Sequence, residues 1–162
     1  MDCYYSDLEK RTDKGDTLYN LRNCAYMEDF FRPKIVWKRV GSVIKFSYDD
    51  QKIFALDSTC FAIGKDIKFL VAVLNSKMGK YLLKDSPQTG TGDLLISVQA
   101  IEPLKVPIPN VEILKSVEQR VDRIVKNIAN KIQVKQLEEE INKIIYKLYH
   151  LSIEEIEFIE SQ

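Results

Sequence analysis

The stretch of residues 32–48 constrains the fold most strongly, because two runs of alternating apolar and polar residues flank the pair Gly41-Ser42. A pair that begins with glycine suits the type II′ turn, whose twist matches that of two antiparallel strands. Pro33 pushes the residue before it towards an extended conformation, which favours the start of a strand here. The pattern therefore predicts a β-hairpin closed by a two-residue turn.

The predicted hairpin is strongly basic, although the formal net charge of the whole chain is zero. It carries five basic residues, no acidic residue and the only tryptophan of the sequence. Alternation along the first strand gives one face with Ile35, Trp37 and Arg39 and a second face with Lys34, Val36 and Lys38. A basic, aromatic ribbon of two strands can reach a phosphate backbone or a major groove. The alternative is an ordinary antiparallel pair in which lysines on a solvated face protect a sheet edge.

The length of 162 residues, with 45% hydrophobic and 30% charged residues, indicates one soluble globular domain, or one domain with an appendage. Residues 1–110 carry an excess of two positive charges, and residues 111–162 carry an excess of two negative charges. Positive charge is therefore local: it lies in the hairpin and in a second group of lysines further along the chain. That second group consists of Lys65, Lys68, Lys77, Lys80 and Lys84.

The three cysteines, Cys3, Cys24 and Cys60, lie far apart and show no CxxC spacing. The sequence therefore supports neither a disulfide framework nor a zinc site, and it predicts small buried thiols in a reducing cytoplasm. No run is long and apolar enough to cross a membrane, and the N-terminus lacks the basic head and apolar core of a signal peptide. We therefore expect a cytoplasmic protein that has no membrane partner.

After the hairpin, residues 53–56 and 59–63 are predicted to form two short strands. Asp66 is a suitable N-cap for the helix that follows, in which apolar residues recur at spacings of three and four. Residues 86–93 form a loop of small residues, and the next five residues are a strand or an entry segment. Three prolines within residues 103–109 exclude a helix there.

The last part of the chain, residues 111–162, contains no glycine or proline and carries two apolar stripes at helical spacing. The stripes slip out of phase near residues 133–135, which marks either a bend between two helices or a drift along one helix. Ser152 and Glu155 form a capping box, so a last short helix is expected to begin there.

Together these segments predict an α+β fold: a compact mixed α/β domain with an antiparallel hairpin, followed by long C-terminal helices. We divide the chain into a flexible lead-in at residues 1–17, the α/β domain at residues 18–110, and a helical spacer or docking segment at residues 111–162.

No pattern in the sequence indicates an active site. His150 lies just past a predicted helix end, with no nucleophile or carboxylate placed to work with it, so we interpret it as a helix C-cap. Glu138, Glu139 and Glu140 are contiguous, so they point in different directions on a helix. The sequence lacks the Asn/Asp-Pro-Pro-Tyr/Phe motif of adenine methylation and a glycine-rich S-adenosylmethionine loop. We therefore expect no catalytic residue, metal ligand or cofactor site in this chain.

Six short segments follow one another in a characteristic order. They are residues 21–26 (LRNCAY), 31–37 (FRPKIVW), 74–77 (LNSK), 104–109 (LKVPIP), 140–149 (EINKIIYKLY) and 151–156 (LSIEEI). In this order the chain resembles, over about residues 18–160, the TaqI-like C-terminal specificity domain of type IIG restriction–modification enzymes and related adenine-specific DNA methyltransferases. The order is also similar to that of one half of a type I restriction specificity subunit.

The resemblance implies a target recognition domain that grips duplex DNA and reads a short sequence. A separate methyltransferase region would flip the adenine and methylate it with S-adenosylmethionine, and a restriction endonuclease that uses Mg²⁺ is sometimes fused as well. This chain would then be the specificity fragment of a larger enzyme, with that region of the parent as its partner. His150 stands where the family commonly has glycine, and Asn142 stands where aspartate is usual. We expect a different helix-end corner at the first position and one altered hydrogen bond at the second.

With the resemblance, the basic residues are predicted to clamp phosphates, the loop at residues 89–92 is predicted to face a groove, and Arg39, Asn75 or Gln88 is predicted to read a base edge. The complete predicted DNA-binding set is Arg32, Lys34, Trp37, Lys38, Arg39, Lys45, Lys65, Lys68, Asn75, Lys77, Lys80, Lys84, Gln88, Thr89 and Thr91. Two other functions stay open: a helical protein-docking module that does not bind DNA, and a free-standing enzyme that acts without a partner.

Overall fold

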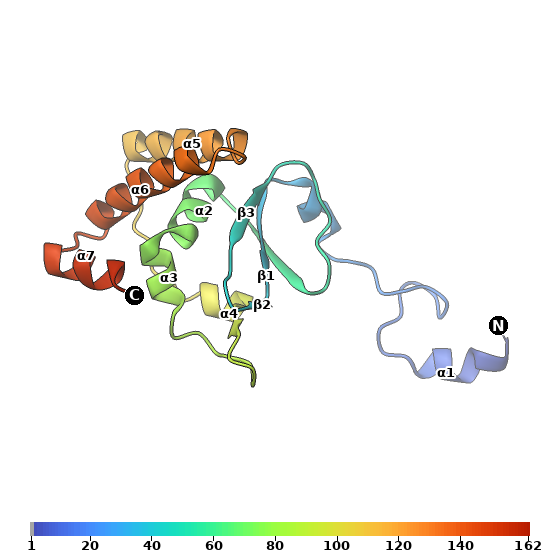
Figure 1. The fold of residues 1–162 in the computed structure, drawn as a ribbon. Coiled ribbons are helices and arrows are strands. Elements are labelled where there is room, and N and C mark those ends of the chain that lie inside the picture. Colours follow the sequence, from blue (N-terminus) through green and yellow to red (C-terminus); the bar gives the residue numbers. More distant parts are fainter. Residues whose placement is uncertain (1) are drawn as a thin grey trace.

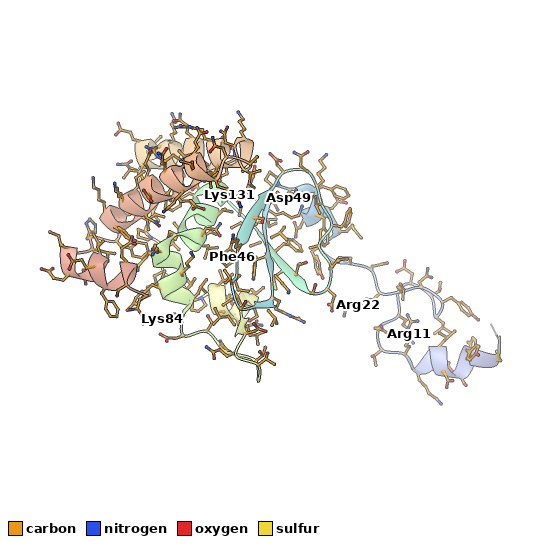
Figure 2. The ribbon with its side chains drawn as sticks, viewed as in Figure 1. Arg11, Arg22, Phe46, Asp49, Lys84 and Lys131 are labelled. Atoms are coloured by element: carbon orange, nitrogen blue, oxygen red, sulfur yellow. The ribbon has the colours of Figure 1, made fainter. Side chains whose placement is uncertain are left out.

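The central sheet consists of three short antiparallel strands in the order β3-β1-β4 (Figure 1). They are β1 (Lys34–Lys38), β3 (Phe46–Asp49) and β4 (Thr59–Ile63). Phe46 and Asp49 mark the two ends of β3 in Figure 2. The computed structural model describes residues 2–162, and its mixture of helices and small antiparallel sheets confirms the predicted α+β class.

The predicted strand pairing is confirmed, but the predicted turn is wrong. Trp37 lies opposite Phe46, which is the register that a two-residue turn at Gly41-Ser42 would give. The chain instead leaves β1 and forms β2 (Val40–Gly41), which pairs with β5 (Leu94–Leu95). Backbone groups near Gly41 are therefore satisfied by a distant strand and not by the residues that follow in sequence.

Residues 59–63 form a strand as predicted, whereas the predicted strand at residues 53–56 is wrong. The N–H of Ile53 donates a hydrogen bond of 3.1 Å to the Asp49 carboxylate, which turns the chain away from the edge of the sheet. Phe54 then stacks on Phe30, with 5.0 Å between the ring centroids. This segment therefore covers a face of the sheet, and β4 takes the place beside β1.

Both faces of the sheet are covered. On one face, Ile35, Trp37 and Phe46 are buried in a core that they share with α2 (Ile67–Asn75). On the other face, Phe61 packs against Phe30 of η2 (Met27–Phe31), with 4.7 Å between the ring centroids. The predicted solvated face of β1 is therefore wrong at its first residue.

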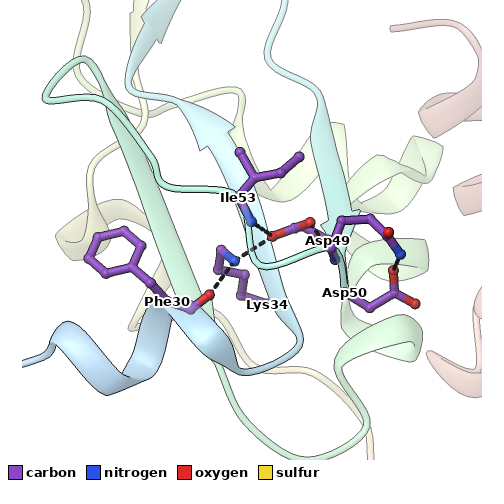
Figure 3. A network of polar contacts seen from close by, with 6 residues as sticks. Phe30, Lys34, Asp49, Asp50 and Ile53 are labelled. Carbon is purple, nitrogen blue, oxygen red and sulfur yellow. Dashed lines mark hydrogen bonds and ion pairs between the residues drawn. The ribbon is translucent and has the colours of Figure 1, made fainter.

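Lys34 is completely buried on that second face, where it forms an ion pair with Asp49 (Figure 3). Its Nζ also donates a hydrogen bond of 2.9 Å to the carbonyl oxygen of Phe30. The Asp49 carboxylate accepts further hydrogen bonds from the N–H groups of Gln51, at 2.9 Å, and Ile53, at 3.1 Å. Burial alone would raise the pKa of Asp49, but these hydrogen bonds and the Lys34 charge outweigh it and lower the pKa.

The predicted helix after Asp66 forms, but it is divided into α2 and α3 (Lys77–Leu83). Asp66 precedes α2 with a φ of 51°, and its side chain makes no capping hydrogen bond. Ser76 divides the two helices, because its hydroxyl accepts a hydrogen bond from the N–H of Gly79 at 3.0 Å and donates one to the carbonyl of Val73 at 2.6 Å. A serine N-cap accepts a hydrogen bond from a free N–H group in the first turn of a new helix. A continuous helix has no free N–H groups at this position and would not need such a cap.

Three helices complete the chain: α5 (Val111–Lys126), α6 (Lys131–Leu148) and α7 (Ile153–Glu160). Figure 1 shows α2 between the sheet and the α5–α6 pair. The break between α5 and α6 lies at residues 127–130, a few residues before the predicted phase slip, because the Asn130 side chain caps α6. The predicted capping box at Ser152 is confirmed.

The corner between α6 and α7 explains the unusual His150. His150 has a φ of 54°, the left-handed conformation that glycine adopts most easily. The N–H of Leu151 donates to the carbonyl of Tyr146 at 3.1 Å, and the N–H of His150 donates to the carbonyl of Lys147 at 3.1 Å. These two bonds form a Schellman motif, so His150 ends the helix as its C′ residue.

The remaining segments are short. α4 (Val98–Ile101) is a single turn, and residues 103–109 contain no helix, as predicted. η1 (Asp2–Tyr4) and α1 (Tyr5–Lys10) lie apart from the rest of the chain (Figure 1). The predicted boundaries at residues 17 and 110 stay predictions, and Met1 of the lead-in lies outside the described residues.

The cysteines are free thiols. Cys24 and Cys60 are half-buried, but the prediction of a buried thiol is wrong for Cys3, which is exposed. In residues 2–162 no helix is long and apolar enough to cross a membrane.

The small β2–β5 sheet is fixed to the end of β1 by one indole group. Trp37 is buried, and its Nε1–H donates a hydrogen bond of 2.7 Å to the carbonyl oxygen of Ile96. The N–H of Ile96 in turn donates to the carbonyl oxygen of Arg39 at 2.9 Å. Both polar groups of the Ile96 backbone are therefore held by the chain at the end of β1.

We predict that Asp49→Asn lowers the free energy of unfolding by about 3 kcal/mol, because it leaves the buried Lys34 charge without its partner. Chemical denaturation with urea measures this loss. Asp50→Asn is the matched control, because Asp50 is adjacent but exposed, and it should change the free energy by less than about 0.5 kcal/mol. Equal effects of the two substitutions would contradict a structural role for the ion pair.

The pH dependence follows from the lowered pKa of Asp49. Its stabilisation is fully present above the unfolded-state pKa of about 3.9 and is lost as the pH falls through the lower folded-state pKa. The difference in stability between the unaltered protein and Asp49→Asn should therefore be constant near neutral pH and narrow below about pH 4.

We predict that Trp37→Phe loosens the β2–β5 sheet, because phenylalanine keeps an aromatic ring but cannot donate to Ile96. Loss of one buried hydrogen bond costs roughly 1–3 kcal/mol, so the amides of Leu95 and Ile96 should exchange with solvent about tenfold faster or more. Hydrogen exchange followed by NMR measures this rate. The amide of Ala62 in β4, which pairs with Ile35 of β1, is the internal control. An equal increase in its exchange rate would indicate that the substitution destabilises the whole domain.

Candidate nucleic-acid interface

A small hairpin projects from the end of the sheet at which β1 and β2 meet, and we call residues 87–95 the tip hairpin. The N–H of Leu95 donates to the carbonyl of Pro87 at 2.7 Å, and the N–H of Thr89 donates to the carbonyl of Asp93 at 2.8 Å. The N–H of Gly92 closes the turn on the carbonyl of Thr89 at 2.9 Å. Gly92 has a φ of 84°, so the turn ends in the left-handed residue of a three-residue hairpin loop. The segment predicted as a loop of small residues is therefore an ordered hairpin.

The end of the tip hairpin presents polar groups to solvent. The hydroxyls of Thr89 and Thr91 lie 2.8 Å apart, and the Thr89 hydroxyl accepts a hydrogen bond of 3.2 Å from the N–H of Asp93. Among the residues that the structure describes, none accepts a hydrogen bond from the N–H of Gly90 or Thr91. A Cβ added to Gly90 would meet no atom within 4 Å, so this backbone is open to an approaching molecule. Gln88 is also exposed.

Three of the predicted basic residues lie at the same end of the sheet and do not pair with a carboxylate of the described residues. Lys38 is the last residue of β1, Arg39 follows it, and Lys45 precedes β3. Because Trp37 is paired with Phe46, Lys38 and Lys45 are each one residue beyond the last pair and lie near each other. All three side chains are exposed, and within residues 2–162 none forms an ion pair. Arg32 is also exposed, but its guanidinium lies 3.4 Å from the Asp29 carboxylate.

Two predicted DNA-binding residues of the hairpin are corrected by their burial. Lys34 has no exposed surface and is neutralised by Asp49, and Trp37 is 3% exposed with its Nε1–H bonded to Ile96. Neither side chain can touch a phosphate or a base from these positions. Alternation of apolar and polar residues does not reveal that a polar face is covered by another segment of the chain.

Asn75 is also corrected, because its amide group is used inside the protein. Its Oδ1 accepts a hydrogen bond of 3.0 Å from the N–H of Phe46, and its Nδ2 donates to the carbonyls of Phe46, at 2.7 Å, and Val71, at 3.1 Å. The side chain thereby ties the end of α2 to the outer edge of β3. Asn142 has a similar role, because its Oδ1 accepts from the N–H of Lys77 at 2.9 Å.

The predicted second strip of lysines is not continuous. Lys68 forms an ion pair of 2.6 Å with Asp122, and this hydrogen-bonded partner raises the pKa of Lys68. Lys77 forms an ion pair of 3.2 Å with Glu160, and the ammonium of Lys84 lies 4.3 Å from the centroid of the Tyr81 ring. Lys65 and Lys80 are exposed. Three of the five lysines therefore have partners within the chain.

A groove between β3 and α6 brings together basic residues that the sequence did not connect. It has a volume of about 1310 Å³, and we call it the β3–α6 groove. Lys45 lines it from the sheet, Lys80 lines it from α3, and Lys143 and Lys147 line it from α6. The spacing of four between Lys143 and Lys147 indicates a shared helix face, but only the packed structure shows that this face turns towards the sheet.

Potential metal ligands are scattered over the described residues. Within residues 2–162 there is no group of three or more His, Cys, Asp or Glu side chains that could hold a metal ion. His150 is exposed at the α6–α7 corner and has no hydrogen-bond partner for its ring among the described residues. The exposed cations and the tip hairpin form the candidate binding site.

A protein-family model matches the N-terminal part of the chain. The family model described as the TaqI-like C-terminal specificity domain matches residues 2–104, which include the central sheet, α2, α3 and the tip hairpin. The helices α5, α6 and α7 lie outside the matched residues, whereas the resemblance seen in the sequence extended over residues 18–160. No curated protein matches the chain. Membership of this family supports sequence-specific DNA recognition in a restriction–modification context. Because the match covers more than half of the chain, the protein belongs to the family of TaqI-like C-terminal specificity domains.

Proposed function

We propose that this chain reads a short sequence in duplex DNA as the specificity part of a type IIG restriction–modification enzyme. One observation carries the proposal: exposed cations without carboxylate partners lie at the base of an ordered hairpin whose end presents free amides and hydroxyls. Cations without internal partners are available for phosphates, and a narrow two-stranded hairpin can enter a major groove about 12 Å wide.

We infer that residues at the base of the tip hairpin and residues at its end contact different parts of the DNA. Lys38 and Lys45 are flexible point charges, which suits contacts with phosphates that set position but carry no sequence information. Arg39 and Gln88 have side chains that can form two hydrogen bonds with one base edge, to guanine and adenine respectively. The hydroxyl of Thr91 and the N–H of Gly90 supply further donors that either a base or a phosphate can accept.

The anchoring of the tip hairpin supports a role in recognition. A segment that reads bases loses less entropy on binding when it is already ordered. The carbonyl of Ile96 is held by Trp37 and the N–H of Ile96 by the carbonyl of Arg39, so the hairpin and the Arg39 backbone move as one unit. We expect the spacing between the Arg39 side chain and the end of the hairpin to be set before DNA arrives.

We further propose that the chemistry belongs to another region of the parent enzyme. That region would methylate adenine with S-adenosylmethionine, and an associated nuclease would use Mg²⁺ to cleave DNA. The sequence of this chain has no glycine-rich loop for the cofactor, so we assign none of its residues to either group. The proposed partner of this chain is therefore the methyltransferase or nuclease region, and the proposed location is the cytoplasm.

We predict that Lys38→Ala weakens binding to duplex DNA of every sequence and lowers the slope of the logarithm of affinity against the logarithm of salt concentration by about one. Fluorescence anisotropy with a mixed-sequence duplex across a salt series measures this slope. Lys131→Ala is the matched control, because Lys131 is an exposed lysine at the start of α6 (Figure 2) and should leave the slope unchanged. A slope unaffected by Lys38→Ala would remove Lys38 from the phosphate contacts.

Failure of the unaltered chain to bind any duplex at low salt would leave the family assignment intact but contradict DNA binding by this chain alone. Adding the methyltransferase region in trans would then test whether the complex is needed. Binding restored by that region would show that the specificity part needs the methyltransferase region in order to hold DNA.

We predict that Gln88→Ala relaxes specificity at one base pair and leaves the salt slope unchanged, because the side chain is assigned to a base edge and not to a phosphate. The preferred duplex is first selected from a random pool, and its affinity is then compared with that of a panel of singly substituted duplexes. The discrimination lost at one position should be about 1–3 kcal/mol. Equal weakening across the whole panel would show that Gln88 does not read a base.

A further inference from the structure

The β3–α6 groove has a lining that differs from the DNA-binding surface proposed above. Its apolar wall includes Val43, Val125 and Ile128, which are 68%, 53% and 74% exposed. These aliphatic side chains come from the loop before β3 and from the end of α5 and the turn after it, so they flank the groove from both sides. Exposed aliphatic groups that gather around a groove are typical of a site that binds a protein. A sugar–phosphate backbone offers no comparable apolar surface.

The charge of the groove indicates the chemistry of its partner. Six lysines line it, and they are Lys45, Lys77, Lys80, Lys135, Lys143 and Lys147. Only three acidic residues line it, namely Glu138, Glu139 and Glu160, and Glu160 is paired with Lys77. The groove therefore keeps an excess of positive charge after its internal ion pair is formed. An acidic partner would be complementary to this lining.

The edge of the sheet indicates the secondary structure of that partner. A strand added beside β3 would need the backbone groups of Phe46, but the Asn75 amide already binds both its N–H and its carbonyl. Asn75 thereby occupies the outward-facing backbone groups at the first residue of β3, which disfavours strand addition at this edge. The other side of the groove is formed by helices α5 and α6, whose surfaces suit the ridges of a third helix.

We propose that the β3–α6 groove binds an amphipathic helix of another polypeptide, with an apolar stripe that contacts Val125 and Ile128 and acidic residues beside the stripe that face Lys143 and Lys147. This inference does not depend on DNA binding, because it rests on a different surface. Lys45, Lys77 and Lys80 line the groove and also belong to the predicted DNA-binding set, so none of the three is used in the test.

The test uses a designed peptide of about 18 residues, long enough to form a helix, with leucines at helical spacing and glutamates elsewhere. Its binding to the full chain is measured by fluorescence anisotropy, with a scrambled peptide of the same composition and a peptide with lysine in place of glutamate as controls. A mixed-sequence duplex is titrated separately against every protein variant. The expected dissociation constant is micromolar, with each control peptide at least about tenfold weaker.

Two matched pairs of variants locate the binding site. Ile128→Asp removes an apolar side chain that lines the groove, whereas Ile132→Asp changes an isoleucine of similar exposure, 76%, that does not line it. Lys143→Glu reverses a groove charge, whereas Lys131→Glu reverses the charge of an exposed lysine outside the groove. Each groove variant should lose about tenfold in peptide affinity, and each control should change it by less than about twofold.

Three results would overturn the proposal. The first is a designed peptide that binds no more tightly than its scrambled control. The second is an equal loss for the groove variants and their matched controls. The third is a loss of duplex affinity in the groove variants with no loss of peptide affinity, which would assign the groove to DNA instead.

Discussion

The buried ion pair between Lys34 and Asp49 is the interaction on which the arrangement of the sheet depends. Desolvation of two charges usually cancels most of their attraction, so such a pair adds little stability compared with apolar residues of the same size. Its value is in selecting one register. Lys34 lies directly opposite Asp49, and a slip of one residue would turn the lysine to the other face of β1, among Ile35 and Trp37 and without a carboxylate. The ion pair therefore makes a slip of one residue energetically costly.

The same ion pair organises two segments that cover one face of the sheet. The Asp49 carboxylate accepts hydrogen bonds from the N–H groups of Gln51 and Ile53, and the Lys34 ammonium donates one to the carbonyl of Phe30. The segment after β3 and the helix η2 therefore both pack on this face of the sheet. At the other end of β1, Trp37 holds Ile96. The five-residue strand β1 is thus fixed at its first residue by the Lys34–Asp49 ion pair and near its end by the hydrogen bond of the Trp37 indole. Lys38 and Arg39 come directly after Trp37 in the chain, so the backbone that carries these two exposed cations is held in place by the strand.

The sequence predicted the local parts of this arrangement well. The register of β1 and β3, the position of β4 and the capping box at Ser152 follow from short-range patterns, and each is confirmed. The prediction of a turn at Gly41-Ser42 was wrong because Val40 and Gly41 pair with β5, more than fifty residues later in the chain. Local sequence patterns do not indicate such a distant partner. Within the candidate site, the exposure of Lys38, Arg39 and Gln88 agrees with their predicted roles, which stay predictions. Lys34 and Asn75 could not be interpreted from sequence, because their partners are a distant carboxylate and the backbone of another strand.

The tip hairpin is anchored in a way that allows its exposed side chains to change without loss of the fold. The groups that hold the hairpin are almost all main-chain atoms: the carbonyls of Pro87, Arg39 and Ile96 and the N–H groups of Leu95 and Ile96. Any residue other than proline supplies these atoms, so side chains at positions such as 88 and 91 can vary without disturbing the anchor. Trp37 is a buried side chain that also holds the hairpin, through its hydrogen bond to the carbonyl of Ile96. The atoms that anchor the hairpin are therefore largely distinct from the exposed side chains that we propose contact DNA.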